Sequence, residues 1–577
     1  MPPSPRNGKN WCSNWNSRLS SRVPVTRFAR QRLAHGLKLG KRHTPSQGPL
    51  TTSTQRKSTP TRSSAFAVSA GILLSKVIGL VRERVFAYYF GNSDAADAFR
   101  SAFRIPNFLQ NLFGEGVLSA SFIPVYARLR AEERHEEATR LAESIFAILF
   151  FVTSLLTLVG VFATPWLIDA IAPGFHGEKR QLTIRLVQIL FPGAALLVIS
   201  AWCLGILNSH RKFFLSYAAP VIWNVAQITA LLWEGGHVTE PRLAIVLAIG
   251  CVIGSGLQFA VQLPTVMGFL RPLQGKLTLR TEQVNTVTRN FLPVFVSRGV
   301  VQISAYVDSV LASFLPTGAV SALGYAQTLN SLPVSLFGMA ISAAELPAMS
   351  SALGTQEEIG LVLRQRLENG LKNISFFVIP SAVAFLVLGD VVVATIYRSG
   401  HFGPSDVTFV WSVLAGSSVG LLATTSGRLY SSAFYALRDT RTPLNFALIR
   451  VVLTVALGYL FALPLPRLLG IDHRWGVAGL TLSAGMAGWV EFALLRRALQ
   501  ARIGAVVASA ARIARLWVGA LISAAGAYGV KRVLPFHRPE LVGVCVLSVF
   551  GLGYLVCTRL LGVAAPGSLA RLLRRRA

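Results

Sequence analysis

The sequence predicts an all-α polytopic membrane protein with about 14 transmembrane helices. Three observations predict this fold class. The 577 residues have a mean hydropathy of +0.52, and only 14% of them are charged, whereas a soluble domain carries roughly 25% charged residues. Apolar runs of about 20 residues, the length that crosses a bilayer, recur between short polar loops. A sequence repeat relates the two halves of this series.

The expected spans follow these apolar runs in order. They cover residues 66–90, 96–127, 141–173, 182–208, 214–234, 243–270, 284–315, 319–350, 358–389, 406–436, 443–464, 475–499, 510–533 and 540–562. Alternate loops differ in charge, and one set holds most of the loop cations, namely Arg128, Arg130, Arg134, Arg211, Lys212, Arg271, Lys276, Arg280, Arg438, Arg441, Arg496, Arg497 and Arg502. Basic loops face the cytoplasm. An even number of spans and two basic tails therefore predict that both termini are cytoplasmic.

The repeat pairs LFGEGVLSASFIP at 112–124 with LFGMAISAAELP at 336–347. Ser75-Lys76 precedes the first copy by about as much as Ser297-Arg298 precedes the second. Two equivalent bundles around a central space are a common plan of transporters. We therefore expect two pseudo-symmetric six-helix lobes and two additional C-terminal helices. The expected divisions are a basic tail 1–65, an N-lobe 66–270, a C-lobe 271–500, helices 13 and 14 in 501–565 and a basic tail 566–577.

The first 65 residues differ in composition from the rest. They contain thirteen Lys or Arg and no Asp or Glu, a balance that cannot bury a core and predicts disorder. They lack the apolar centre of a secretory signal. A cytoplasmic basic tail near anionic lipid and an over-extended start codon are the favoured interpretations, and an organelle transit peptide is the third.

Composition and motifs exclude several classes. The formal net charge of +31 is concentrated in the tails and at helix ends, where membrane topology accounts for it, so nucleic acid is not an expected partner. The five cysteines form no CxxC pattern, which argues against a disulfide framework or a zinc site. No DxD, HExxH or P-loop pattern supports a membrane glycosyl- or phosphotransferase. We expect a protein that is not an enzyme and carries no cofactor.

The most informative segment is 75–128, because it places ionisable side chains within expected spans. These are Lys76, Arg82, Glu83, Arg84, Asp97, Arg100, Arg104 and Glu115. A charge at the centre of a bilayer costs about 2.5–3.5 kcal/mol on insertion scales, so such residues face a water-filled cavity, an ion or a partner. Glu83 and Arg84 lie near a helix end and are expected at the interface. Cations in a membrane cavity indicate an anionic cargo.

Motifs in this segment and beyond it carry a family resemblance. Ser75-Lys76-Val77-Ile78-Gly79-Leu80-Val81-Arg82-Glu83 follows an S-R-x-x-G-x-x-R-[DE] pattern, and Asp97-Ala98-Phe99, Pro106-Asn107, Phe113-Gly114-Glu115-Gly116, Tyr325-Ala326, Leu336-Phe337-Gly338 and the segment 434–443, FYALRDTRTP, accompany it. With these motifs the chain resembles the MurJ/MviN family of lipid II flippases, within the multidrug/oligosaccharidyl-lipid/polysaccharide exporter superfamily. The resemblance covers roughly 66–565.

The resemblance implies a flippase that moves lipid-linked peptidoglycan precursor across the bacterial cytoplasmic (inner) membrane by alternating access, for cell-wall biogenesis and cell shape. The implied cargo is a glycan joined to a polyprenyl chain by a pyrophosphate, which cationic side chains bind through charge-assisted hydrogen bonds. Membrane lipid and cell-wall synthesis proteins are the other implied partners. Coupling to Na⁺, to H⁺ or to the membrane potential stays open. Helices 13 and 14 are implied to extend a groove for the lipid tail.

The chain departs from the family pattern at cationic positions. The first-span arginine is Lys76, and Gln110, Asn111 and Thr328 stand where arginines are expected. Arg100, Arg104 and Arg298 are candidates to compensate. Because of these departures, two alternative functions remain: an exporter of another polyprenyl-linked glycan and a non-transporting membrane scaffold. A drug exporter is not expected, since a cationic drug would be repelled by such a cavity.

Arg82 is the first candidate for contact with the cargo phosphate, and Lys76 and Arg298 are the next. Arg82 and Lys76 are six residues apart, about 120° around an ideal helix, so both are expected to line one broad groove. A structural ion pair between Arg82 and Asp97, or a snorkelling contact of Arg82 with lipid headgroups, is the alternative to cargo binding.

Four acidic residues are candidates for gating or ion coupling. Asp97 and Glu115 are assigned to gating or ion pairing. For Asp97 the alternative is that it caps a helix. Glu115 lies between two glycines, which permit close approach of neighbouring helices. Asp308, an isolated carboxylate in the seventh span, and Asp439 are candidates for cation coupling. Asp439 could equally cap the helix that follows Thr440.

Overall fold

The computed structural model describes residues 62–270, 281–351, 355–506, 509–534 and 538–563. These residues form helices and connecting turns, with no β-strand among them. The expected basic tails, 1–65 and 566–577, lie almost entirely outside the described residues, as do the basic loop positions from Arg271 to Arg280. The all-helical prediction is confirmed for the described part.

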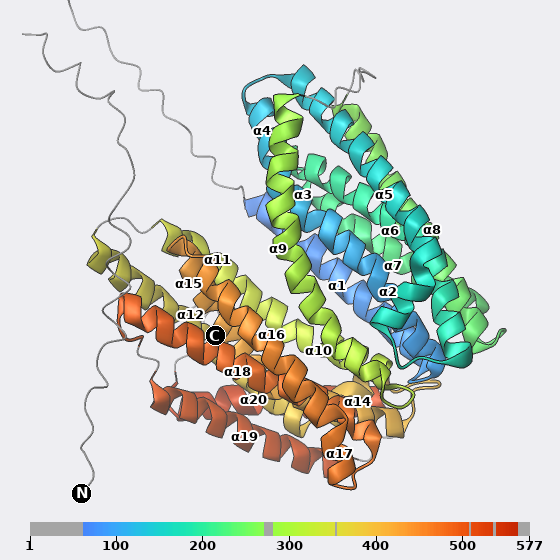
Figure 1. Ribbon diagram of the computed structural model, residues 1–577. Coiled ribbons are helices and arrows are strands. Elements are labelled where there is room, and N and C mark those ends of the chain that lie inside the picture. Colours follow the sequence, from blue (N-terminus) through green and yellow to red (C-terminus); the bar gives the residue numbers. More distant parts are fainter. Residues whose placement is uncertain (1–61, 271–280, 352–354, 507–508, 535–537, 564–577) are drawn as a thin grey trace, which may run out of the picture. The chain divides into compact units, whose positions relative to one another are not determined.

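The first eight helices pack on one another and are called the N-terminal group (Figure 1). They are α1 (Arg62–Phe90), α2 (Asp94–Phe113), α3 (Glu115–Ser121), α4 (Ile123–Ala131), α5 (His135–Ile171), α6 (Gly177–Ser209), α7 (Phe213–Glu234) and α8 (Glu240–Phe269). Within this group α6 packs on α2, α5 and α8, while α1 packs on α7.

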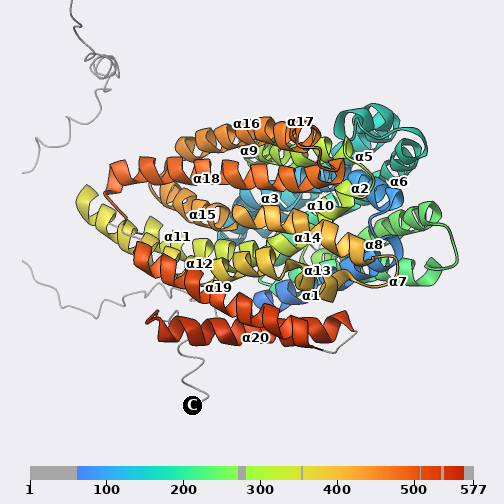
Figure 2. The same ribbon diagram turned by 90° about the horizontal axis from the view of Figure 1, so that it is seen from below.

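The later helices form a second set, called the C-terminal group. They are α9 (Glu282–Ser313), α10 (Ala319–Pro333), a π-helical turn (Val334–Met339), α11 (Ala340–Ser350), α12 (Gln356–Val387), α13 (Gly389–Tyr397), α14 (Pro404–Val419), α15 (Leu421–Ala436), α16 (Arg441–Ala462), α17 (Pro464–Leu468), a 3₁₀ turn (His473–Trp475) and α18 (Gly476–Ile503). Two last helices, α19 (Ala510–Val533) and α20 (Pro539–Leu560), pack together and against α12 and α13 (Figure 2). Helix α9 contacts both groups, since it packs on α2, α3 and α5 as well as on α10 and α16.

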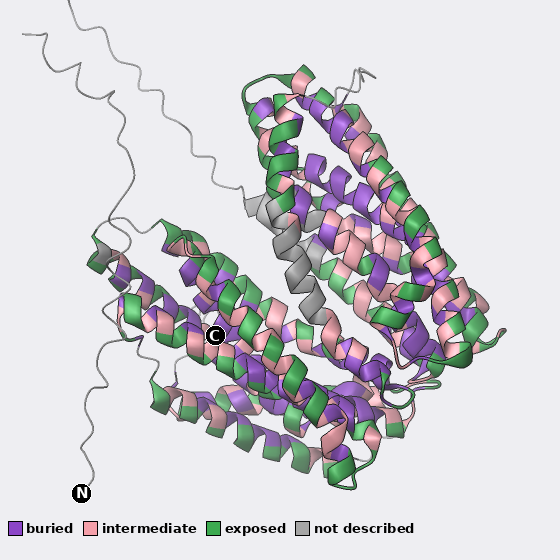
Figure 3. Cartoon of the chain, viewed as in Figure 1, coloured by how far each residue is buried: buried purple, intermediate pink, exposed green. Residues whose placement is uncertain are grey.

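Ten helices or continuous helical segments are long and apolar enough to cross a membrane, or eleven if the bent pair α14–α15 is one span, within the residues that could be searched. Helix α2 is not among them because it carries Asp94, Asp97, Arg100 and Arg104. Large apolar side chains are exposed on the surface of the bundle, and Figure 3 shows in green where exposed residues lie along the helices. On α5 these include Phe151, Phe162 and Trp166. Such faces fit a lipid environment.

Three spans that the sequence predicts as continuous are interrupted. The 96–127 span breaks at Gly114, whose ψ of −131° is not helical, and gives α2, α3 and α4. The 319–350 span is interrupted by the π turn. The 406–436 span bends by 41° between α14 and α15 at Gly420, where an added Cβ would lie 2.4 Å from the Cα of Gly485 on α18. Close helix contact therefore produces this bend.

The interruptions give the sequence repeat a structural meaning. Both copies of the LFG motif lie where regular α-helix is interrupted, but in different ways. Leu112-Phe113-Gly114 ends α2 at a non-helical glycine, and Leu336-Phe337-Gly338 lies in a π turn between α10 and α11. The two segments thus both depart from regular α-helix, although their local structures differ.

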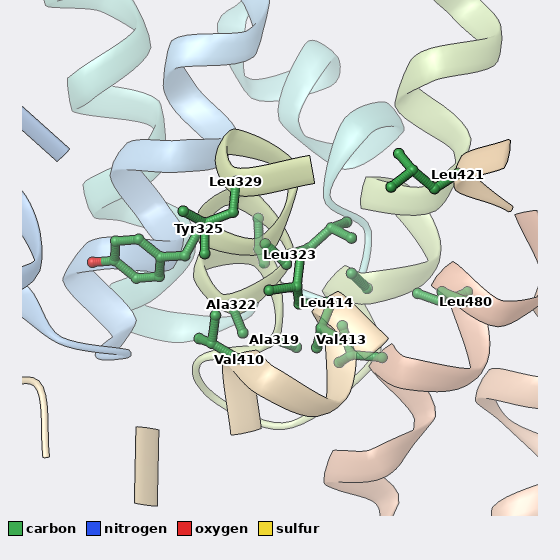
Figure 4. Close-up of a cluster of buried hydrophobic side chains, with 14 of the residues drawn as sticks. Ala319, Ala322, Leu323, Tyr325, Leu329, Val410, Val413, Leu414, Leu421 and Leu480 are labelled. Atoms are coloured by element: carbon green, nitrogen blue, oxygen red, sulfur yellow. The ribbon is translucent and has the colours of Figure 1, made fainter. Parts of the chain in front are cut away.

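The buried core of the C-terminal group joins α10, α14 and α18. Figure 4 shows Leu323, Val413 and Leu480 among the side chains of this cluster. Tyr325 extends from it, is fully buried, and donates a hydrogen bond to the carbonyl of Gly91 at 2.9 Å. The core therefore fixes a residue that reaches the N-terminal group.

Candidate functional site

A cavity of about 390 Å³ lies where α1, α2, α7 and α8 meet α9 and α10. Aromatic and aliphatic side chains form part of its wall, and polar amides and hydroxyls form another part. Its lining residues are Arg82, Glu83, Phe86, Phe99, Arg100, Phe103, Arg104, Asn107, Gln227, Leu231, Leu247, Tyr306, Gly324, Gln327, Thr328 and Ser331. Three arginines face a single carboxylate in this lining. The cavity therefore carries an excess of positive charge.

Glu83 is bound by two of these arginines. Arg82 contacts one carboxylate oxygen and Arg100 the other, each at 2.5 Å. Glu83 is 5% exposed, so its carboxylate lies inside the protein, and its expected position at the membrane interface stays a prediction. The reason is that its side chain points from α1 towards α2, where Arg100 supplies a partner 17 residues away. One carboxylate compensates only one of the two guanidinium charges.

Arg100 is held between the two groups of helices. Its guanidinium carbon lies 4.8 Å from the ring centre of Phe86 on α1 and 4.6 Å from that of Tyr325 on α10, distances at which a cation is attracted by an aromatic face. A Cβ at Gly324 would lie 3.0 Å from the Cδ of Arg100. A glycine at this position of α10 therefore leaves the space that Arg100 occupies.

Arg104 follows Arg100 by one turn of α2 and also faces the cavity. Tyr306 on α9 donates a hydrogen bond to the Arg104 carbonyl at 2.8 Å, and the guanidinium lies 5.9 Å from the Tyr306 ring centre. Asp308 lies within electrostatic range of Arg104. The structure leaves a buried acceptor oxygen of Asp308, Oδ1, without a hydrogen-bond partner among the described residues.

The three predicted cargo-binding cations have different positions. Arg82 lines the cavity, and its guanidinium carbon lies 5.3 Å from the ring centre of Trp223. Lys76 is exposed and is not among the lining residues, because the 120° between the two side chains turns it away from Arg82's surroundings. The backbone of Arg298 belongs to α9, but its side chain lies outside the described residues.

Asp97 does not pair with Arg82 in this structure. Its carboxylate contacts Lys179 at 2.7 Å and accepts the backbone N–H groups of Gly318 at 2.8 Å and Ser321 at 2.7 Å. Asp97 is 1% exposed. It therefore caps the start of α10, which belongs to the other group of helices, and the capping alternative describes this contact better than the Arg82 pair. Glu115 begins α3, and its side chain lies outside the described residues.

Further hydrogen bonds join the two groups near Asp97, and this region is called the closed end. The backbone N–H of His401 donates to the carbonyl of Tyr88 at 2.8 Å. Thr317 donates to Asp94 at 2.9 Å, and Asn92 donates to Asp406 at 3.1 Å. Several independent contacts thus hold α1 and α2 against the segments that begin α10 and α14.

Asp439 caps a helix, which is the alternative to a cation site that the sequence analysis left open. It accepts the backbone N–H groups of Arg441 and Thr442, both at 3.0 Å, and the Thr442 hydroxyl at 2.7 Å. Arg502 on α18 contacts it at 2.7 Å. Both carboxylate oxygens are therefore engaged at the first turn of α16.

Capping by Asp439 gives a pH-dependent prediction. The N–H and hydroxyl of Thr442, followed by Arg502, lower the pKa of Asp439 from 3.8 to about 2. A lowered pKa in the folded state stabilises the protein above pH 4, and this contribution disappears as the pH falls from about 4 to about 2. We expect Asp439→Ala to destabilise the protein by about 1 kcal/mol at pH 7 and by almost nothing near pH 2. Thermal unfolding in detergent at both pH values measures the difference, and an equal effect at both would contradict it.

An apolar groove of about 640 Å³ adjoins the cavity. Arg104 and Tyr306 line both spaces. Its other walls come from α2, α5, α6, α9 and α16, and they are Ile105, Phe108, Leu109, Leu156, Val159, Gly160, Ala163, Leu167, Ala170, Ile171, Phe191, Val307, Val310, Leu311 and Val455. A charged cavity and an apolar groove therefore meet at one boundary.

Sequence reasoning missed both arginine partners of Glu83 and the lysine partner of Asp97. Arg100 and Arg104 are four residues apart, which places both on one face of α2, and this spacing could have identified them as a cavity pair. Lys179 lies 82 residues from Asp97, at the start of α6. No local pattern connects those two positions.

The fold and the cationic cavity define a polytopic transporter architecture. The chain belongs to the MurJ family, since residues 86–546 match the family model described as lipid II flippase MurJ. The lipid II flippase MurJ of Burkholderia cenocepacia is 33% identical over 447 residues, which cover 75% of this chain and 83% of the relative. A probable lipid II flippase MurJ of Rhizobium meliloti is 32% identical over 481 residues, covering 80% and 85% of the two chains.

Solved structures agree with this fold. A lipid II flippase MurJ in an inward closed conformation superposes with a TM-score of 0.71 at 24% identity, covering 86% of this chain and 98% of the other. An inward-facing multidrug resistance MATE family transporter of the MOP superfamily gives a TM-score of 0.60 at 17% identity, covering 76% and 98%. At these identities the likeness concerns the fold.

Proposed function

We propose that this chain flips lipid II, the lipid-linked precursor of peptidoglycan, across the bacterial cytoplasmic membrane. Membership of the MurJ family supports the activity and the cargo. The observation that carries the proposal is the junction of the cationic cavity with the apolar groove at Arg104 and Tyr306. A lipid-linked pyrophosphate has both parts that such a junction accommodates, a charged group and a long hydrocarbon chain.

The cavity arginines bind the cargo's phosphates in this proposal. Arg82 and Arg100 supply charge-assisted hydrogen bonds of the kind that hold phosphate, and Arg104 adds a third cation near the groove. Aromatic and amide side chains in the remaining lining suit the glycan part. The groove between α5 and α9 receives the polyprenyl chain, in place of the groove expected at helices 13 and 14.

Alternating access explains the contacts at the closed end. The basic loops lie at the other end of the helices. On the positive-inside rule we therefore propose that the closed end faces the outer surface and that both termini are cytoplasmic. Opening of the contacts around Asp97 would then release cargo to the outer leaflet. We propose 14 spans, in which α2–α4, α10–α11 and α14–α15 each count as one and the short helices α13 and α17 are not counted, in two six-helix lobes with α19 and α20 added.

Asp308 is the proposed site of coupling to Na⁺ or H⁺. Its buried Oδ1 has no hydrogen-bond partner among the described residues, and Arg104 lies within electrostatic range, so uptake of a cation or proton there would change the electrostatic field at the cavity. Asp439 is engaged in capping α16 and contributes no open oxygen to this proposal. The membrane potential is the alternative driving force.

Complementation tests the proposed function. When the endogenous lipid II flippase of a suitable bacterium is depleted, we expect the full chain to restore growth and Arg82→Ala to abolish the rescue, because one of the three cavity cations is lost. Arg84→Ala is the matched control. Arg84 lies two residues away on α1 but contacts Glu540 and the carbonyl of Thr395 instead of the cavity, so we expect its rescue to persist. Failure of a well-inserted wild-type chain to restore growth would overturn the lipid II assignment.

An exporter of another polyprenyl-linked glycan is the second candidate. Gln327 and Thr328 line the cavity at the place where the family pattern has a cation, and this altered lining favours a different headgroup. Identification of the glycan lipid that accumulates when the chain is deleted from its native host separates the two cargoes.

A further inference from the structure

A second group of intramembrane charges lies away from the cavity, on α15, α16 and α18. Arg450 on α16 contacts Glu491 on α18, with 3.3 Å between Nη1 and Oε2. Arg428 on α15 lies within electrostatic range of both. None of the three lines the cavity described above. Arg450 is paired with the one carboxylate and Arg428 is not, so this group also has one positive charge in excess.

These charges lie at bilayer depth. Arg428 precedes the end of α15 by eight residues, and Arg450 follows the start of α16 by nine. At 1.5 Å per residue they are about 12 Å and about 14 Å from those helix ends, well inside a hydrocarbon core that is about 30 Å thick. A cation at this depth requires water, an acidic partner or an anionic ligand.

Arg428 belongs to a polar face of α15. Thr424, Arg428, Ser431 and Tyr435 follow one another at spacings of four, three and four residues, which places them on one side of the helix. Arg428 and Tyr435 are exposed, and Thr424 and Ser431 are partly exposed. The exposed face of neighbouring α16 is apolar and includes Leu444, Leu448, Ile449 and Val452. The α15 face therefore presents a cation and three hydroxyl groups at bilayer depth.

The second group lies nearer to the basic loops than the first. Arg82 precedes the end of α1 by eight residues, about 12 Å from the closed end, whereas Arg428 is about 12 Å from the opposite end. Asp308 lies within electrostatic range of both Arg104 and Arg450. The Asp308 carboxylate is therefore within electrostatic range of one cavity arginine and of one arginine of the second group.

We propose that Arg428 and Arg450 form a second anion-binding site, which holds the pyrophosphate of a membrane-embedded lipid before it reaches the cavity. This inference rests on the proposed function and adds an earlier position on the same path. Glu491 acts as a positioning residue, because it holds Arg450 while no carboxylate contacts the Arg428 guanidinium among the described ion pairs. A pyrophosphate offers the oxygens needed to bridge two guanidinium groups.

Binding stoichiometry tests the second site. The probe is farnesyl pyrophosphate, titrated by equilibrium dialysis against the full chain in neutral detergent. We expect two bound equivalents in the wild type and one in Arg428→Ala/Arg450→Ala, with the dissociation constant of the lost equivalent raised at least tenfold. Arg82→Ala/Arg100→Ala should remove the other equivalent. Arg428→Lys/Arg450→Lys keeps both charges and should retain two equivalents with weakened affinity at the second site.

The controls separate binding from folding. Arg497→Ala removes an exposed arginine of α18 outside the group and should leave both equivalents in place, and melting temperatures identify any variant that fails to fold. A wild type that binds one equivalent, lost in Arg82→Ala/Arg100→Ala and unchanged in Arg428→Ala/Arg450→Ala, would overturn the second site while the proposed function stands. A wild type that binds none would also overturn it, and the complementation experiment then decides the proposed function by itself.

Discussion

Replacement of Glu83 by alanine is expected to abolish transport and to destabilise the protein by about 3–5 kcal/mol, the range for breaking a buried ion pair. Glu83 is the only carboxylate that lines the described cavity. The Arg82 and Arg100 side chains are 20% and 16% exposed. Without Glu83 they would face each other as buried like charges, at the contact between α1 and α2.

Two conservative variants distinguish charge from shape at this position. Glu83→Asp keeps the negative charge and should retain part of the stability, whereas Glu83→Gln keeps the size but loses the charge and should resemble alanine. Thermal unfolding in detergent measures the loss of stability, and growth after flippase depletion measures transport. Inorganic pyrophosphate should raise the melting temperature of Glu83→Ala more than that of the wild type, because it supplies the missing negative charge. A Glu83→Ala protein with wild-type melting temperature and growth would contradict this account.

The helical fold was predictable because a bilayer imposes length and hydropathy on every span. The apolar run 141–173 corresponds to α5, which begins six residues earlier and ends two residues earlier, and the run 540–562 corresponds to α20 within two residues at each end. The interruptions at Gly114 and Gly420 were not predictable from hydropathy, because apolar composition continues through them. The bend at Gly420 depends on contact with Gly485, 65 residues later.

The cationic character of the site was predictable, but its pairing was not. The cavity position of Arg82 was predictable, because Arg82 is a cation within an apolar run. The sequence could not decide that Glu83, rather than Asp97, is its partner, because both acids are within reach of plausible helix orientations. Helix periodicity does not define how α1 is rotated about its own axis. This rotation decides which side chains face the cavity, and it turns Arg82 into the cavity and leaves Lys76 exposed.

Replacement of Asp97 by alanine is expected to open the closed end. The substitution removes the partner of Lys179 and leaves the backbone N–H groups of Gly318 and Ser321 without their acceptor. Breaking a buried charged contact costs about 3–5 kcal/mol, and about 5.5 kcal/mol suffices to move a two-state equilibrium from 99:1 to 1:99. Two of the lost hydrogen bonds join α2 to the start of α10, and these bonds exist only when the end is closed. The loss of stability therefore falls mostly on the closed state.

Spin labels at His237 and Leu468, two exposed residues near the closed end of the N-terminal and C-terminal groups, measure this opening by their distance distribution. We expect a longer distance to dominate in Asp97→Ala. Asp94→Ala is the matched control, since Asp94 also contacts Lys179 at the same end, but its side chain is 58% exposed and an exposed ion pair contributes only about 0–1 kcal/mol. Its distances should remain close to those of a labelled protein with both acids intact. Equal distributions in all three proteins would mean that the remaining contacts, such as that between His401 and Tyr88, hold the end closed without Asp97.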